Sequence, residues 1–202
     1  MVTPTPLADA PDADLIRHAI AGRREAFAEI YRRYHTVVYR FARMMSGSSA
    51  IAEDVTQETF TNLLRDLRRY EPDRSALSTY LYGVARNVTR SRLRRERRFV
   101  RLEITEESEP ISACDPSIDF EQSQNRMRLR RIIEELPSRY REVVILCGLH
   151  GLPYAEVAII LGTPVGTVRS RLSRGRQAIA DRVRELENGP RVIPARTARC
   201  VV

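Results

Sequence analysis

The sequence lacks lysine and tryptophan, and all of its 34 basic residues are arginine. Codon usage in a GC-rich genome is the simplest explanation for an all-arginine set, but the physical consequence is the same whatever the cause. The guanidinium fork binds phosphates and guanine edges better than the lysine ammonium does. The net charge of +8 and the pI of about 10.0 favour a polyanionic partner, either nucleic acid or an acidic membrane surface.

Cysteine and histidine are equally scarce. The three cysteines, Cys114, Cys147 and Cys200, are far apart and form no CxxC pair, which argues against a zinc site and a disulfide scaffold. The three histidines show no metal-ligand spacing, and no pair of carboxylates converges on one point. We therefore predict no metal, no cofactor and no catalytic site, and a nucleic-acid enzyme is an unfavoured alternative.

Long apolar segments are absent as well. No segment approaches the roughly 18 consecutive apolar residues of a membrane-spanning helix. The N-terminal stretch MVTPTPLADAPDAD lacks the apolar core of a signal peptide. These absences predict a cytoplasmic protein.

Composition divides the chain into five parts. Residues 1–12 are proline-rich and predicted to be a disordered tail, and 188–202 form a second tail. Residues 102–125 contain no basic residue, seven acidic ones and two prolines, which is typical of a flexible linker. Helical periodicity runs through 13–101 and 126–187. We predict an all-α protein of two small helical domains joined by an acidic linker; VVILC, 143–147, could pass for a strand, but helix is favoured.

Two surfaces stand out in the first domain. In AEDVTQETF, 52–60, one helical face carries Asp54, Gln57 and Glu58. This face suits a basic protein partner, although periodicity alone favours an ordinary exposed face. The helix that follows Ser75 ends in an arginine stripe, with tyrosines at its start. Arginines beside aromatic rings are typical of contact with phosphates and unstacked bases, but Tyr82 could equally pack in the core.

The second domain contains a helix-turn-helix pattern within 152–183. Gly162 is placed to end the first helix, and Thr163-Pro164 to begin the second. On the second helix Val168, Leu172 and Gly175 share a buried side. The outward surface holds arginine and small polar residues without an acid, which favours DNA contact over a solvated face.

Together these segments resemble the extracytoplasmic-function (ECF) group of bacterial RNA polymerase sigma factors, over roughly 14–187. AEDVTQETF is similar to the region 2 segment that docks on the clamp of the polymerase largest subunit. STYLYGVARNVTRSRLRR, 78–95, is similar to the segment that recognises and melts the −10 element. The segment from LPSRY, 136–140, to RQAI, 176–179, is similar to region 4, which binds the −35 element.

The resemblance implies roles residue by residue. Polymerase contacts are implied at Asp54, Gln57 and Glu58. Contacts to −10 DNA are implied at Tyr80, Arg86, Asn87, Arg90 and Arg94, and contacts to −35 DNA at Thr167, Arg169, Ser170, Ser173 and Arg174. Position 80 is tyrosine where the family often has tryptophan, which weakens the expected stacking.

The resemblance also implies partners. These are core RNA polymerase, through its clamp and flap, promoter DNA, and an anti-sigma factor. An acidic linker could thread the polymerase RNA channel or be a plain tether, and the sequence does not decide between them. The alternative function is an autonomous helix-turn-helix regulator, but such proteins usually dimerise on palindromes, and this chain shows no heptad or clear dimer face.

Overall fold

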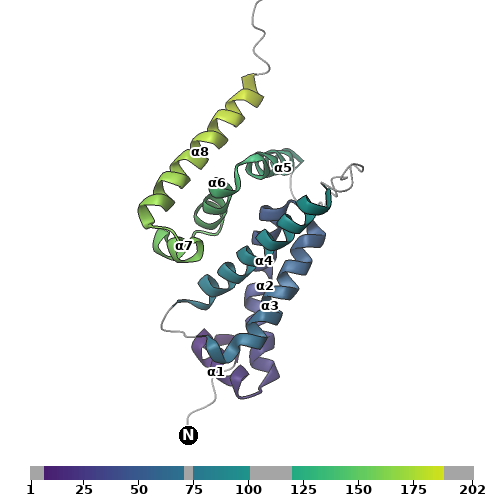
Figure 1. Ribbon diagram of the computed structural model, residues 1–202, viewed down its shortest axis with the longest axis vertical. Helices are drawn as coiled ribbons and strands as arrows, with labels where there is room; N and C mark the ends of the chain where they lie inside the picture. The colour runs from purple at the N-terminus through teal and green to yellow at the C-terminus, as the bar shows by residue number, and fades with distance from the viewer. Residues whose placement is uncertain (1–6, 71–74, 101–119, 189–202) are drawn as a thin grey trace, which may run out of the picture.

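A computed structural model describes residues 7–70, 75–100 and 120–188, and every regular element in these ranges is helical. Figure 1 shows two groups of helices, α1–α4 and α5–α8, lying against each other. The first group comprises the turn η1 (Leu7–Asp9), α1 (Asp12–Ile20), α2 (Arg24–Ser46), α3 (Ser49–Asp66), the turn η2 (Leu67–Arg69) and α4 (Leu77–Val100). The second comprises α5 (Phe120–Glu135), α6 (Ser138–Val143), η3 (Val144–Leu149), α7 (Tyr154–Leu161) and α8 (Val165–Asn188). The predicted all-α fold is confirmed.

The first domain is held together by the apolar faces of its three long helices. Fully buried side chains lie one or two helical turns apart on each: Ile30, Val38, Phe41 and Met45 on α2, Val55 and Leu63 on α3, and Leu77 and Leu81 on α4. Each such side chain stabilises the fold by about 1.5–3 kcal/mol relative to an exposed one. Leu64, which follows the buried Leu63 on α3, is exposed.

The N-terminal tail predicted over 1–12 is wrong for residues 7–12. Leu7–Asp9 forms a helical turn, Ala10 is buried and α1 begins at Asp12. Arg33 on α2 fastens this segment: its guanidinium donates to the carbonyl oxygens of Leu7 and Ala8 and pairs with Asp12 at 3.1 Å. The Tyr34 hydroxyl also donates to Asp12, so long-range contacts from α2 order a segment whose composition is typical of disorder.

Residues 143–147 are helical, as predicted, but not as a plain α-helix. After α6 the chain widens into a π-helix, η3, whose wider turn is closed by the amide of His150 donating to the carbonyl of Ile145 at 3.0 Å. The side chains of Val144, Ile145 and Leu146 are buried.

Proline marks the helix starts in the second domain. The carbonyls of Pro137, Pro153 and Pro164 accept the first backbone hydrogen bonds of α6, α7 and α8. Gly162 ends α7 in the left-handed conformation, with φ of 61°, as predicted. The predicted start of α8 is shifted by one residue, because Pro164 takes the cap position and the Thr163 hydroxyl has no hydrogen-bond partner.

Several predicted segments fall partly or wholly outside the described residues. Most of the acidic linker lies there, as does nearly all of the C-terminal tail. α5 begins at Phe120, inside the range 102–125 that composition assigns to the linker. The five-part division therefore stays a prediction. In the ranges that the structure describes, no helix is both long enough and apolar enough to cross a membrane.

Gly175 permits the close packing of α8 on α6 and η3. A Cβ atom at this position would lie 2.7 Å from Cγ2 of Val144 and 3.5 Å from Cβ of Tyr140. Real side chains essentially never approach so closely, so any larger residue would push the helices apart. Gly166, on the same helix, has nothing within 4 Å of such an atom.

We predict that Gly175→Ala lowers the free energy of unfolding by about 1–3 kcal/mol, because overpacking displaces a buried valine. The matched variant Gly166→Ala should raise it by roughly 0.5–1 kcal/mol, since alanine favours the helical state where space is open. Chemical denaturation followed by circular dichroism measures both. A Gly175→Ala variant as stable as the Gly166→Ala variant would contradict the packing argument.

Candidate nucleic-acid interface

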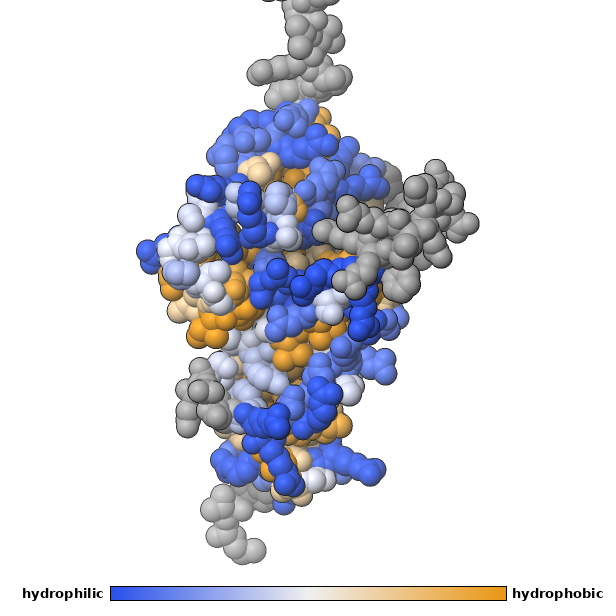
Figure 2. All heavy atoms as spheres, in the orientation of Figure 1, coloured by the Kyte–Doolittle hydropathy of each residue, from blue (hydrophilic) through white to orange (hydrophobic). Residues whose placement is uncertain are grey.

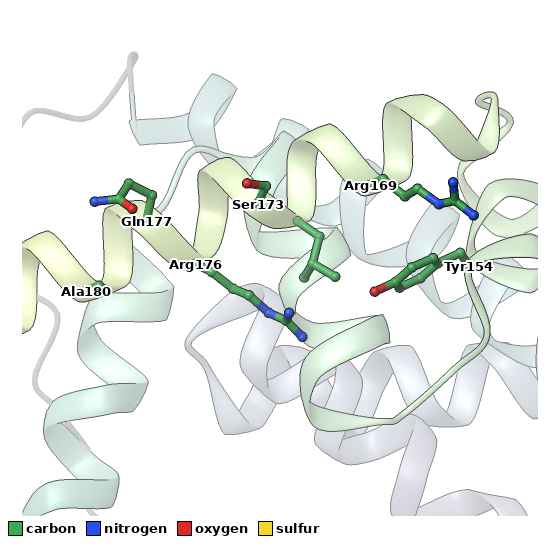
Figure 3. A pocket seen from close by; sticks show the side chains of 7 residues that line it. Tyr154, Arg169, Ser173, Arg176, Gln177 and Ala180 are labelled. Atoms are coloured by element: carbon green, nitrogen blue, oxygen red, sulfur yellow. The ribbon is translucent and has the colours of Figure 1, made fainter.

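An open groove of about 480 Å³ runs along one side of α8, beside the start of α7. Figure 3 shows the side chains that line it. They are Tyr154, Arg169, Leu172, Ser173, Arg176, Gln177 and Ala180. Of the residues predicted to contact −35 DNA, the groove brings together Arg169 and Ser173. It is a basic and polar surface with an aromatic ring at one end.

Tyr154 supports Arg169 within this groove. The Arg169 guanidinium lies over the tyrosine ring, 6.0 Å from its centroid, and Figure 3 shows the hydroxyl end of the ring pointing along the groove toward Arg176. Sequence reasoning did not include Tyr154, Arg176 or Gln177 among the residues that contact −35 DNA. Tyr154 is the first residue of α7, and only the tertiary contact with α8 brings it beside Arg169.

The remaining predicted −35 residues lie elsewhere on α8. Arg174 hydrogen-bonds Tyr140 of α6, which lowers the pKa of the phenol; Arg139 lies over the same ring, 4.8 Å from its centroid. The Ser170 hydroxyl donates to the Thr167 carbonyl at 3.0 Å, and Thr167 is half-buried. The outward surface of α8 therefore has two sides: the groove, and a second strip where Arg174 lies beside Tyr140.

The predicted −10 residues of α4 differ in their exposure. Asn87, Arg90 and Arg94 are exposed to solvent. Tyr80 is half-buried and packs edge-on against Tyr70, with 5.5 Å between ring centroids. The alternative for Tyr82 is correct: its ring lies in the core against Phe41.

Arg86 does not face solvent, because the second domain covers it. Its Nε donates to Oε2 of Glu142 on α6 at 3.0 Å, and its Nη1 donates to the Ile160 carbonyl on α7 at 3.4 Å. The Arg86 side chain is 13% exposed and that of Glu142 5%. Arg90 extends the pair from the exposed side, with its Nε 3.8 Å from Oε1 of Glu142.

Two further polar contacts join α4 to the second domain. The hydroxyl of Tyr82 lies 2.8 Å from Nδ1 of His150, and the hydroxyl of Thr79 donates to Glu156 at 2.6 Å. Burial raises the pKa of Tyr82 to about 12. Burial, together with the nearby charge of Arg40, lowers the pKa of His150. The imidazole therefore favours its neutral form where the domains meet.

A second contact lies at the end of α2. Arg141 of α6 donates to the Met45 carbonyl at 3.0 Å and also to the carbonyls of Glu134 and Leu136. Arg43 of α2 lies 3.7 Å from Glu134 of α5. The domains thus meet along α4 and at the end of α2, through these hydrogen bonds and ion pairs and through buried apolar side chains that both domains contribute to one continuous core.

The predicted polymerase-binding residues form an exposed acidic surface on α3. Asp54 and Gln57 are exposed, and the Glu58 side chain is 45% exposed. Arg92 of α4 spans two of them: Nη1 donates to Oδ2 of Asp54 at 2.5 Å, and Nη2 to Oε2 of Glu58 at 2.8 Å. Arg92 bonds only one oxygen of each carboxylate, and both acidic side chains remain partly exposed to a basic partner.

Exposed apolar residues gather on the second domain around α7. Figure 2 shows hydrophobic atoms at the surface there and along the seam between the two domains. Ile159 on α7 and Leu149 at the end of η3 are the most exposed apolar side chains of this part. Neither of these side chains lines the groove beside α8.

Comparison with known proteins places these surfaces in one family. Residues 30–99 match the family described as Sigma-70 region 2, and residues 126–179 the family described as Sigma-70, region 4. The ECF RNA polymerase sigma factor SigW of Bacillus subtilis is 30% identical over 183 residues, which cover 85% of this chain and 96% of that protein. The chain belongs to the ECF sigma factors.

Two further similarities support the assignment of this sigma factor. The ECF RNA polymerase sigma factor SigE of Mycolicibacterium smegmatis is 34% identical over 155 residues, which cover 76% of this chain and 60% of that protein. The sigma factor RpoE of Bartonella quintana, solved with the anti-sigma factor NepR, has a TM-score of 0.66 at 26% identity, covering 78% of this chain and 96% of that one. The predicted family is confirmed, and the groove on α8 and the arginines of α4 belong to its regions 4 and 2.

We predict that mild acid loosens the contact between the two domains of the sigma factor. His150 meets Tyr82 of α4 and the charge of Arg40 of α2, and its pKa is lowered in the closed arrangement. Below the ordinary imidazole pKa of about 6.5, protonation therefore favours states in which His150 is exposed, whereas at higher pH the closed state bears no such penalty. Small-angle X-ray scattering should show a larger radius of gyration at about pH 5.5 than at about pH 7.5.

The control for this prediction is His150→Gln. Glutamine cannot be protonated in this range, so the variant should lose the part of the expansion that comes from position 150. Any expansion that comes from acid acting on other groups should remain. An expansion of equal size in the variant and the parent protein would contradict a role for His150.

Proposed function

We propose that this ECF sigma factor binds core RNA polymerase and directs it to promoters by recognising their −10 and −35 elements and by helping to melt the −10 region. Family membership carries the proposal, and the distribution of charge over the domains supports it. A basic polar groove lies on the helix-turn-helix, arginines line α4, and an acidic surface lies on α3. DNA requires a basic surface, whereas a basic protein partner requires an acidic one.

Region 4 is proposed to lie in the −35 major groove with α8. Arg169, held over the Tyr154 ring, is the candidate for a bidentate contact to a base edge. Ser173, Arg176 and Gln177 lie along the same groove and can contact neighbouring bases or phosphates. Arg174, on the Tyr140 side, is better placed for the phosphate backbone.

Region 2 is proposed to hold the −10 strand along α4. Arg90 and Arg94 supply phosphate contacts, and Asn87 is free to contact a base edge. Tyr80 forms a T-shaped pair with Tyr70 and is partly exposed, so an unstacked base could pack against the exposed part of its ring. Unstacking costs a few kcal/mol per step, so docking on polymerase has to hold the complex in place while the strands separate.

The acidic surface of α3 is proposed to bind the polymerase clamp through Asp54, Gln57 and Glu58. Arg92 fixes the two carboxylates one helical turn apart and reduces their mutual repulsion. Because Arg92 lies on α4, the same side chain connects the polymerase-binding surface with the DNA-binding helix.

An anti-sigma factor is the proposed regulatory partner. RpoE, which shares this fold at 26% identity, was solved with one. The alternative of an autonomous helix-turn-helix regulator is not favoured, because regions 2 and 4 occur together in the order and spacing of sigma factors. Sigma factors are not enzymes, and we propose that this chain likewise has no catalytic activity of its own.

Transcription with purified core polymerase tests the proposed function. We expect specific initiation only when both core and this factor are present, and specific DNA binding to require core. The double variant Asp54→Ala, Glu58→Ala should weaken binding to core about tenfold or more, because two charged contacts are lost. Titration of labelled core measures the affinity.

Glu53→Ala is the matched control, since Glu53 is an exposed acid on α3 between the buried residues and the docking surface. It should leave core affinity nearly unchanged. Tight, sequence-specific binding to DNA by the factor alone would contradict the proposal and favour the autonomous regulator.

We predict that Arg169→Ala relaxes preference at one −35 position, with a loss of about 1–3 kcal/mol in discrimination. Tyr154→Ala should cause a smaller loss at the same position, because the arginine remains but loses the ring that supports it. Tyr154→Phe keeps the ring and should therefore keep the preference. Arg174→Ala should weaken all promoters alike. Transcription from a library of −35 variants measures these effects, and sequence-blind losses for Arg169→Ala would show that it binds only the backbone.

A further inference from the structure

Residues 7–12, near the start of the chain, are held by two adjacent side chains of α2. Arg33 bonds the backbone of this segment and one carboxylate oxygen of Asp12, and the hydroxyl of Tyr34 donates to the other oxygen. Asp12 stands in the first turn of α1, where a negative charge also stabilises the helix. The two oxygens of one carboxylate thus tie the beginning of α1 to α2.

Arg33 is fixed in turn by a second acid. Its Nε donates to Oε1 of Glu29 at 2.8 Å, and the Glu29 side chain is 10% exposed. Hydrogen bonds from Arg32 and Arg33 lower the pKa of Glu29 to about 2, so this carboxylate is charged at neutral pH. Because the guanidinium is bonded on one side to Glu29, it has little freedom on the other, and the position of Asp12 is closely defined.

Asp12 also lies beside the aromatic residues proposed to meet the −10 strand. α1 packs against η2, and Tyr70 directly follows η2 in the chain. Burial and the nearby charge of Asp12 raise the pKa of the Tyr70 phenol. The Tyr70 hydroxyl donates to the Ser75 carbonyl at 2.8 Å, and its ring forms the T-shaped pair with Tyr80. A continuous set of interactions therefore runs from residues 7–12, through Asp12 and Tyr70, to Tyr80.

We propose that residues 7–12 are a positioning element of the −10 site, which holds the Tyr70–Tyr80 pair in the orientation that receives an unstacked base. Asp12 is the positioning residue, because it bonds Tyr34 and borders Tyr70. The inference rests on the proposed function, since it takes the exposed part of the Tyr80 ring as the place where the base packs. It gives a role to a segment that lies outside both stretches matched to sigma factor regions.

The charge of the segment argues that it acts through other residues and does not touch DNA itself. Residues 1–16 contain three acids, Asp9, Asp12 and Asp14, and no basic residue. Such a surface repels a strand of phosphates. Arg33 and Tyr34 bond the Asp12 carboxylate from within the protein, so it serves as an acceptor that orders its neighbours.

The place of these contacts determines which step depends on them. Tyr80 is half-buried, so part of its ring is available while Tyr70 and the core set its orientation. A ring that is turned away binds an unstacked base less well, but it changes nothing for a base that is still paired. The acidic surface of α3 and the groove on α8 contain none of these residues. Loss of Asp12 should therefore slow strand separation and spare polymerase docking and −35 recognition.

The test uses the holoenzyme assembled from core polymerase and the full chain, on a promoter that the parent factor transcribes. The promoter is supplied as a duplex and in a second form whose −10 segment is held open by mismatches. Asp12→Asn keeps the shape of the side chain and removes its charge. We expect it to slow open-complex formation on the duplex by about three- to tenfold.

Initiation from the mismatched template should be nearly unchanged in Asp12→Asn, because the mismatches already supply the cost of unstacking. Affinity for core, measured by titration of labelled core, should also stay the same. Equal slowing on both templates, or slowing on neither, would overturn the proposal.

Asp14→Asn is the matched control. Asp14 lies in the same turn of α1 and pairs with Arg17, three residues further on, at 2.8 Å. The substitution removes the same charge from the same turn, and it should leave both templates and core affinity unaffected. If the two variants slowed open-complex formation to the same extent, charge and not position would be responsible, and the proposal would fail.

A double-mutant cycle with Tyr80 tests whether Asp12 acts through the aromatic pair. We expect Tyr80→Leu to slow open-complex formation on the duplex. In that background Asp12→Asn should add little, because the ring that it positions is no longer there. A general loss of stability would add in full in both backgrounds, so additive losses would contradict the positioning role.

Tyr34→Phe covers a failure of Asp12→Asn to fold. It removes the hydroxyl that donates to Asp12 and keeps the ring. It should slow open-complex formation on the duplex less than Asp12→Asn does, and again spare the mismatched template. Open-complex formation at the parent rate by a folded Tyr34→Phe variant and by a folded Asp12→Asn variant would overturn the proposal.

Hydrogen exchange in the free chain separates this inference from the proposed function. The amides of Tyr70 and Tyr80 make backbone hydrogen bonds within their own turns. They should exchange faster in Asp12→Asn than in the parent chain or in Asp14→Asn, because the local structure opens more often. Unchanged exchange would overturn the positioning role. A parent factor that initiates from no promoter, combined with faster exchange in Asp12→Asn, would refute the proposed function and leave the link between residues 7–12 and the tyrosines intact.

Discussion

The buried ion pair between Arg86 and Glu142 constrains how the two domains meet along α4. It is the most enclosed charged contact between the two domains, and the neighbouring hydrogen bonds of Thr79 and Tyr82 lie on the same side of α4. A buried carboxylate without its partner is strongly unfavourable, so the two charges hold each other in place. Because these two residues lie 56 positions apart in sequence and belong to different domains, a change at either one alters how both domains are presented to a partner.

α4 serves three different surfaces at once. Its apolar side, with Leu77, Leu81 and Ala85, completes the core of the first domain. Further along, Arg92 reaches the carboxylates of α3 that are proposed to bind polymerase. Its third side carries Arg86 toward region 4. A helix with three such neighbours cannot shift without disturbing each of them, and this provides a physical route by which docking on polymerase can influence the exposure of a DNA-binding side chain.

Much of the fold could be predicted from the sequence, because helical periodicity and proline and glycine boundaries are local properties. The buried side of α8 at Val168, Leu172 and Gly175 and the end of α7 at Gly162 are examples. What could not be predicted are pairings between distant segments. An arginine stripe has the same spacing whether its partner is a phosphate or a remote carboxylate, so Arg86 could not be distinguished from Arg90. Likewise the anchoring of Leu7 by Arg33, and the packing of Tyr154 beneath Arg169, depend on tertiary contacts that periodicity does not contain.

The π-helix η3 makes the orientation of His150 depend on the number of residues that precede it in region 4. A π-helical turn is an α-helical turn with one residue inserted, and the residues after it are rotated by about 100° relative to an uninterrupted helix. Here that extra residue separates the tightly packed Val144 from His150, which meets Tyr82. Deletion of a single residue within 144–149 would turn His150 away from α4 while the hydrophobic patterns of α6 and α7 stayed intact. Whether the two domains of a sigma factor associate can thus change through one codon, independently of the residues that contact DNA.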